Sequence, residues 1–166
     1  MALLEILHFP DPRLHLKAHL VKSFDKELKK LVDDMAQTMY QNDGIGLAAT
    51  QVNIQKRLII IDVSKSNDQL LVFVNPEVVS RSGEVIGEEG CLSVPGVYDS
   101  VTRSENISVK FQDLEGNIYT KDYTGLMSVC VQHEIDHLDG KVFVEYLSSL
   151  KQNFIKKKMK KIFKSQ

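Results

Sequence analysis

Apolar residues recur at intervals of three or four positions from Leu28 to Tyr40. This spacing places them on one face of an α-helix. Ser23 is available to cap the start of the helix, and the Asn-Asp-Gly sequence at 42–44 is suited to end it. The pattern therefore predicts an amphipathic helix near the N-terminus.

Shorter apolar runs follow this helix and have the length of β-strands. Ile107, Val109 and Phe111 alternate with polar residues, and a turn at 113–117 leads into another strand-like run at 118–123. These two runs predict a β-hairpin. Three earlier runs are also expected to be strands: residues 57–63, 69–74 and 77–82.

Two more helices are expected near the C-terminus. The first spans residues 126–139, with Thr124 as its candidate N-cap and Gly140 just past its end. Its apolar residues lie on more than one side, which indicates a central, buried helix. The second begins near Ser149, because residues 149–152 resemble a capping box.

Together these elements predict a single α+β domain over residues 1–166, a length that suffices for one core. We expect short, mostly antiparallel strands around the central helix, with the other two helices near the ends of the chain. No internal repeat and no Gly- or Pro-rich linker divides the sequence.

Composition places the chain among ordinary soluble globular proteins, with 43% hydrophobic and 26% charged residues. No apolar run approaches the roughly 18 residues of a membrane span, and the N-terminus lacks the basic region of a secretory signal. Two cysteines cannot form a disulfide framework and suggest a reducing compartment. These features predict a cytoplasmic protein with no membrane association.

Charge is nearly balanced, at a formal net charge of −1, but it is unevenly placed. Residues 146–166 contain seven lysines and no acid, whereas the preceding residues contain 14 basic and 22 acidic side chains. A cationic tail on an anionic body favours a polyanionic partner. The alternative is a solvated helix face whose lysines interact favourably with the C-terminal end of their own helix.

The sequence His-Glu-Ile-Asp-His at 133–137 points to a metal site. His133 and His137 lie about 6 Å apart along a helix axis, so both imidazoles can reach one metal ion. Glu134 can then take a proton from bound water. The alternative is a pair of unrelated histidines, but a buried helix has little reason to carry three ionisable groups so close together unless something satisfies them.

A third ligand is needed. Metzincin proteases would place a histidine where this chain has Phe143, and thermolysin-like enzymes use a downstream Glu, for which Glu145 is a poor candidate. Both protease classes are therefore disfavoured, and an upstream ligand is expected. The upstream and nearby candidates are Cys91, Cys130, His8, His15 and His19.

Cys91 is the preferred third ligand, because it lies in a polar, Gly-flanked segment where backbone can approach a ligand closely. Cys130 is interpreted as a small buried hydrophobe, and the three N-terminal histidines as surface or loop residues. One thiolate and two imidazoles leave a fourth position open for water, as in catalytic metal sites. Such water would act as hydroxide near neutral pH.

The segment at 44–51 is rich in small residues and follows a helix, so it does not fit a phosphate-binding loop. It reads either as a turn into a small strand or as a backbone edge with which an extended peptide can pair. In the second case Gln51 would offer an amide donor to a developing oxyanion.

Three segments together resemble the peptide deformylases. They are G-I-G-L-A-A-T-Q at 44–51, E-G-C-L-S at 89–93 and Q-H-E-I-D-H at 132–137, in the order that this family shows. The resemblance covers essentially the whole chain. It implies a hydrolase that removes the formyl group from formyl-methionine at the N-terminus of newly made polypeptides.

The resemblance also implies roles for individual residues. Cys91, His133 and His137 would bind one divalent metal, with Fe²⁺ expected and Zn²⁺, Ni²⁺ or Co²⁺ acceptable to such a site. Metal-bound hydroxide would attack the formyl carbon, with Glu134 as general base and then general acid. The remaining site residues would hold the oxyanion or the substrate: Gln51 and Leu92 for the oxyanion, and Ile45, Gly46, Gly90, Leu126, Val129 and Cys130 for the substrate.

Bacterial members with a basic C-terminal helix are thought to dock it on the ribosome near the tunnel exit, so residues 148–166 are expected to face ribosomal RNA. We expect a monomer. The alternatives are a metallopeptidase of the His-Glu-x-x-His type and a catalytically silent metal-binding homologue. Asp136 has two interpretations: it either contacts the metal ligands or is a charge at the end of the helix.

Overall fold

The computed structural model describes residues 2–163. Within them the chain forms three α-helices and three short 3-10 helices: α1 (Lys26–Gln41), α2 (Gly125–Leu138), α3 (Ser149–Ile162), η1 (Pro12–His15), η2 (Ala49–Val52) and η3 (Phe143–Tyr146). The same residues form these strands: β1 (Gly46–Ala48), β2 (Leu58–Ile61), β3 (Leu71–Ser82), β4 (Val85–Cys91), β5 (Val94–Arg103), β6 (Asn106–Gln112) and β7 (Ile118–Thr124).

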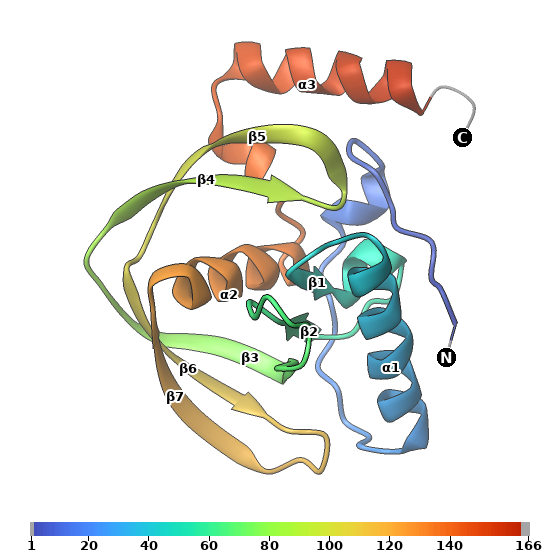
Figure 1. The fold of residues 1–166 in the computed structure, drawn as a ribbon, viewed down its shortest axis with the longest axis vertical. Helices are drawn as coiled ribbons and strands as arrows, with labels where there is room; N and C mark the ends of the chain where they lie inside the picture. The colour runs from blue at the N-terminus through green and yellow to red at the C-terminus, as the bar shows by residue number, and fades with distance from the viewer. Residues whose placement is uncertain (1, 164–166) are drawn as a thin grey trace.

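The strands form two antiparallel sheets, one in the order β1-β2-β3-β6-β7 and one of β4 and β5 alone. Figure 1 shows α2 enclosed between them, with β4 and β5 on one side and the larger sheet on the other. The α+β prediction and the central position of α2 are therefore confirmed.

Strand β2 is buried on both faces, because α1 and α2 cover opposite sides of it. Leu58 and Ile60 pack in one apolar cluster with α1, while Ile59 and Ile61 pack in another with α2. Burying each such side chain contributes about 1.5–3 kcal/mol. This double cover fixes α2, and with it the His-Glu-x-x-His segment, against the larger sheet.

Helix α3 lies across the outside of β5 (Figure 1). Ile155 and Met159 point inward and are buried in a third apolar cluster together with Phe143 of η3. Lys157, Lys158, Lys160 and Lys161 of α3 are exposed, whereas Lys156 is half-buried. Lys164, the last lysine of the chain, lies outside the described residues.

Helix α3 begins at Ser149, as predicted, but the two predicted N-cap residues are wrong by one or two positions. Asp25, not Ser23, caps α1, since its side chain accepts from the backbone N–H of Leu28 at 3.0 Å. Ser148, not Ser149, caps α3 and accepts from the N–H of Lys151 at 3.2 Å. In both places two side chains able to cap a helix lie close together in the sequence. The pattern therefore located the helix N-terminus but not the residue that caps it. Thr124 takes the N-cap position of α2 without a side-chain bond.

The predicted break between strands at 69–74 and 77–82 is also wrong, because β3 is continuous through it. Asn75 adopts φ 51° and the pairing shifts register there, so a bulge accommodates Pro76, which has no N–H to donate. The hairpin of β6 and β7 is confirmed. Strands β4 and β5 were not predicted.

Within residues 2–163, no helix has both the length and the apolar character needed to cross a bilayer.

Candidate metal centre and active site

Helix α2 and the end of β4 bring three metal-binding side chains together. Cys91, His133 and His137 each offer a ligand atom, and these atoms all lie within 4.8 Å of one another. The Cys91 Sγ lies 3.3 Å from the His137 Nε2. Among the described residues this is the one such group, so Cys130 and the N-terminal histidines do not join it. The structure therefore places the predicted third donor beside the two imidazoles.

The donor set suits a metal ion of the kind that thiolate and imidazole bind. The Nδ1 atom of His133 lies 2.8 Å from a Glu89 carboxylate oxygen, which leaves the Nε2 atom of His133 free for an ion. Burial lowers the pKa of His137 well below its ordinary value, so its imidazole stays neutral, as a ligand must. The residues present fit a metal.

Glu134 follows His133 on α2 and is buried. Its Oε2 lies 4.0 Å from the Nε2 of His133, and its Oε1 is a buried oxygen without a hydrogen-bond partner. Burial raises the pKa of Glu134 to about 7. A carboxyl group in this position can take up and release a proton close to the ligand atoms.

The side chain of Gln51 is held by a bond at each end of its amide. Its Oε1 accepts from the N–H of Ala48 at 2.9 Å, and its Nε2 donates to the Ser93 Oγ at 3.0 Å and to the Cys91 Sγ at 3.4 Å. The first bond fixes the amide orientation, so the donor end faces the ligand cluster. This is the orientation that stabilisation of an oxyanion requires.

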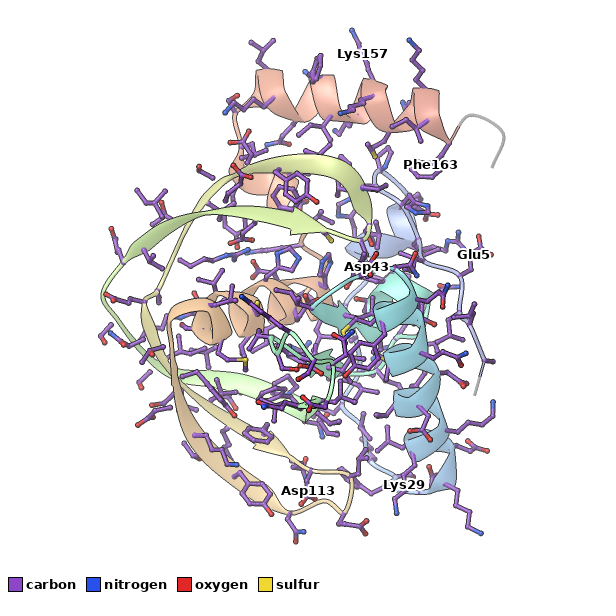
Figure 2. All side chains as sticks on the ribbon, viewed as in Figure 1. Glu5, Lys29, Asp43, Asp113, Lys157 and Phe163 are labelled. Carbon is purple, nitrogen blue, oxygen red and sulfur yellow. The ribbon has the colours of Figure 1, made fainter. Side chains whose placement is uncertain are left out.

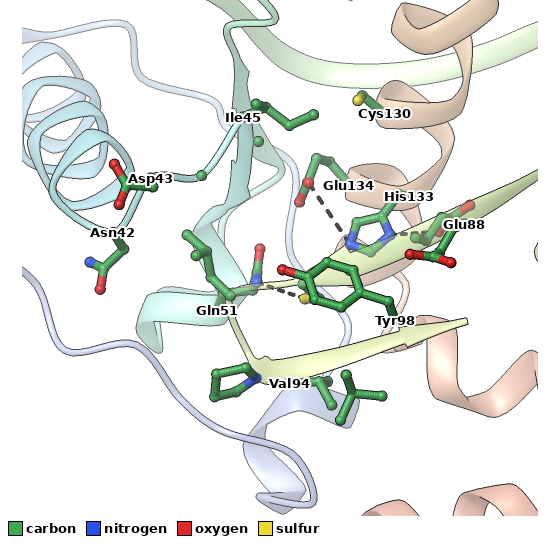
Figure 3. A pocket seen from close by; sticks show the side chains of 18 of the residues that line it. Asn42, Asp43, Ile45, Gln51, Glu88, Val94, Tyr98, Cys130, His133 and Glu134 are labelled. Carbon is green, nitrogen blue, oxygen red and sulfur yellow. Dashed lines mark hydrogen bonds and ion pairs between the residues drawn. The ribbon is translucent and has the colours of Figure 1, made fainter. Parts of the chain in front are cut away.

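A cavity of about 430 Å³ opens next to these groups (Figure 3). Most of the predicted site residues line it: Ile45, Gly46, Gln51, Gly90, Cys91, Leu126, Val129, Cys130, His133, Glu134 and Leu92. His137 lies behind, in contact with Cys91. Burial raises the pKa of Cys130 to about 12, which agrees with its interpretation as an inert packed thiol.

The cavity also has a rim that the sequence did not predict, formed by Asn42, Asp43, Glu88 and Tyr98. The Tyr98 ring lies across β4 at Gly90, where a Cβ atom would come within 2.4 Å of the ring. Strand β1 pairs with β2 on one side only, so the backbone edge predicted at 44–51 is present beside the cavity.

Four further residues form a polar network that reaches His133: Glu89, Arg103, Asp136 and Tyr146. No role was predicted for any of them from the sequence, except for the open question on Asp136. Arg103 is buried and donates to both oxygens of Glu89, at 2.8 and 2.9 Å, and to Asp136 at 2.6 Å. Burial opposes ionisation of Glu89, but the bonds from Arg103 and His133 outweigh it and lower its pKa to about 2. Asp136 is thus a partner of this cluster rather than a free helix-end charge.

The sequence offered a signal for two of them, because Asp136 lies within the 132–137 motif. Glu89 stands in the same short motif as Cys91, whereas Arg103 and Tyr146 lie on other elements, with no spacing that links them to α2.

Comparison with known proteins agrees with this geometry. The family model of polypeptide deformylases matches residues 3–153. The chain belongs to the polypeptide deformylase family. A peptide deformylase of Chromobacterium violaceum is 55% identical over 161 residues, which cover 97% of this chain and 96% of that protein.

Solved deformylase structures have the same fold. A peptide deformylase from Legionella pneumophila is 45% identical, with a TM-score of 0.94 over 99% of this chain and 98% of that one. The peptide deformylase from Ehrlichia chaffeensis, solved in complex with actinonin, is 40% identical with a TM-score of 0.94, over 98% of this chain and 99% of that one. The resemblance drawn from three short motifs is confirmed.

Proposed function

We propose that this protein removes the formyl group from formyl-methionine at the N-terminus of newly made polypeptides. The observation that carries the proposal is the convergence of Cys91, His133 and His137 beside Glu134, at the wall of a cavity that is open to a peptide edge. Membership of the deformylase family supports the same reaction.

A metal held by Cys91, His133 and His137 would supply a Lewis acid that activates water and polarises the formyl carbonyl. Glu134 takes the proton that water releases and delivers it to the departing amine. The Gln51 Nε2 and the Leu92 N–H donate to the oxygen on which negative charge develops. The products are formate and a peptide with a free N-terminal amine.

The cavity supports a methionine side chain at the first position of the substrate. Ile45, Leu126, Val129 and Cys130 line it and offer the apolar surface that a thioether needs. The backbones at Gly46 and Gly90 would pair with the extended peptide. Selectivity for methionine would be moderate, because one methylene is worth only about 1–3 kcal/mol.

The decisive experiment replaces Glu134 by Gln. Turnover of a formyl-Met peptide should fall by about 10²–10⁴-fold, while elemental analysis finds metal content unchanged. Glu77→Gln, at an exposed acid on β3, serves as the control and should retain full turnover. Hydrolysis of an unformylated peptide would instead favour the metallopeptidase, and an inactive wild-type protein would favour a silent homologue.

We further propose that α3 docks the protein on the ribosome through its lysines. Lys151 is paired with Asp99 at 3.1 Å, while Lys157, Lys158, Lys160 and Lys161 are exposed. Lys157 projects from the end of the molecule opposite Lys29 (Figure 2). A surface of this kind suits an RNA backbone.

Deleting residues 150–166 should weaken binding to purified ribosomes and spare hydrolysis of a short formyl peptide. Changing Lys157, Lys160 and Lys161 to Gln should lower the slope of log affinity against log salt by about 2–3. The same change at Lys26, Lys29 and Lys30 on α1 is the matched control. Equal ribosome affinity of the truncated and full chains would contradict the proposal.

Ferrous iron as the resident metal, a monomeric state and a cytoplasmic location also stay predictions. Elemental analysis of anaerobically purified protein, gel filtration and cell fractionation would test them in turn.

A further inference from the structure

A continuous chain of polar contacts runs from a metal-binding histidine to the surface. His133 Nδ1 lies 2.8 Å from Glu89 Oε1, and Arg103 donates to both Glu89 oxygens. The remaining Arg103 nitrogen, Nη1, donates to Asp136 Oδ2 at 2.6 Å. The Tyr146 hydroxyl donates to that same oxygen at 2.8 Å, so the chain ends on η3.

The residues of this chain of contacts are mostly buried, so small changes in their positions change how strongly their charges interact. The side chains of His133, Glu89 and Arg103 are 8%, 5% and 5% exposed, so their charges interact with little screening. Asp136 is 19% exposed, and Tyr146 is about half-exposed. Tyr146 is therefore the solvent-exposed end of an otherwise largely buried network.

Tyr146 constrains the network in two ways. Its hydroxyl shares Asp136 Oδ2 with Arg103, which restricts where that carboxylate can hold the guanidinium. Its ring stacks on the guanidinium, with the Arg103 Cζ 4.9 Å from the ring centroid. Because Arg103 bonds Glu89 at both oxygens, the orientation of the guanidinium sets the position of the carboxylate that faces His133.

We propose that Tyr146 is a positioning residue for the metal centre, acting on His133 through Asp136, Arg103 and Glu89. The inference rests on the metal site of the proposed function. A direct partner of a ligating histidine typically changes metal affinity by about 10–100-fold, so a residue three contacts further out should change it by about 3–10-fold.

The test is Tyr146→Phe, which removes the hydroxyl and keeps the ring on Arg103. The dissociation constant of Co²⁺ is measured by competition with a chelator, together with the visible spectrum of the bound Co²⁺. We expect affinity to fall by about 3–10-fold, with a shift of the Co²⁺ absorption bands, since the histidine ligand reorients. Wild-type affinity and an unchanged spectrum would overturn the proposal.

Tyr40→Phe is the matched control. The Tyr40 hydroxyl donates to Asp62 at 2.6 Å, so the variant loses a comparable tyrosine–aspartate bond without a route to the ligands. It should leave Co²⁺ affinity within about twofold of wild type, whatever it does to stability. An equal loss of affinity in both variants would mean that Tyr146 acts only through general stability.

A double-mutant cycle with Glu89→Gln tests the route. If Tyr146 acts through Glu89, Tyr146→Phe should have little further effect on Co²⁺ affinity in the Glu89→Gln background. Strictly additive effects would overturn the route. Failure of the wild-type protein to bind one Co²⁺ would instead contradict the proposed metal site itself, and with it this inference.

Discussion

Gly46 shows how a missing side chain makes room for a catalytic group. A Cβ atom at this position would lie 2.5 Å from the Glu134 Oε2, closer than real Cβ atoms approach a neighbouring atom. We predict that Gly46→Ala displaces the Glu134 carboxylate and lowers kcat/KM for a formyl-Met peptide by about 10²-fold, because small misplacements of catalytic groups are costly. Steady-state kinetics would measure this, and the melting temperature should change little.

Gly87→Ala is the control for this prediction. Gly87 lies on β4, and a Cβ atom there would meet nothing within 4 Å. This variant should show wild-type kinetics. Full activity of Gly46→Ala would contradict the prediction and mean that catalysis does not depend on the position that the Glu134 carboxylate takes beside Gly46.

The start of α3 permits a prediction at the scale of one element. Ser148 accepts from the N–H of Lys151, and Ser149 is the first helical residue. Ser148→Ala should lower the stability of α3 by about 1 kcal/mol, whereas Ser149→Ala should leave it nearly unchanged. Amide hydrogen exchange within α3 would separate the two variants. Equal exchange in both would mean that the cap contributes nothing.

The end of β2 is anchored by a buried carboxylate, Asp62. It accepts from the Tyr40 hydroxyl at 2.6 Å and from the N–H of Ser64 at 2.9 Å. Burial alone would raise the pKa of Asp62, but bonds from Ser64 and Tyr40 outweigh it, and the pKa is lowered. Because the folded-state pKa lies below the unfolded one, this stability is present above the unfolded pKa and is lost as pH falls through the folded pKa.

Asp62→Asn should therefore reduce the free energy of unfolding by about 1–3 kcal/mol at pH 7, since bonds to a charged group are lost. The difference from wild type should shrink as the pH falls below about 4, the unfolded value. Chemical denaturation at pH 7 and pH 3 would measure it. Asp33→Asn, at an exposed position on α1, should be nearly neutral at both pH values, and a pH-independent effect of Asp62→Asn would contradict the argument.

Elements whose signals are local were predictable from the sequence. Strand β6 alternates cleanly because one of its faces is buried, and His133 and His137 share a helix face by spacing alone. Strands β4 and β5 were missed because residues such as Gly87, Glu88 and Gly90 leave β4 mostly exposed and without an apolar period. The contacts of Arg103 and Tyr146 depend on tertiary packing, which no spacing in the sequence encodes.

At the scale of the whole molecule, the candidate metal centre joins parts that otherwise meet through packing and through the buried polar contacts of Glu89 and Arg103 with α2. Cys91 ends β4 in the smaller sheet, while His133 and His137 belong to α2, which packs on the larger sheet. A bound ion would therefore tie the two sheets together across the cavity. Anything that binds the folded chain and not the unfolded one stabilises it by mass action.

Removing the metal should consequently destabilise the entire fold. With free metal at about 100 times its dissociation constant, binding contributes about 2.7 kcal/mol, which corresponds to a fall in Tm of about 5–10 °C on chelation. Differential scanning calorimetry with and without a chelator would measure it. Cys91→Ala should show almost no chelator effect because one donor is gone, whereas Cys130→Ala, at the cysteine outside the cluster, should keep it. A Tm that chelation leaves unchanged in the wild-type protein would contradict this prediction and show that the two sheets are held together without a metal.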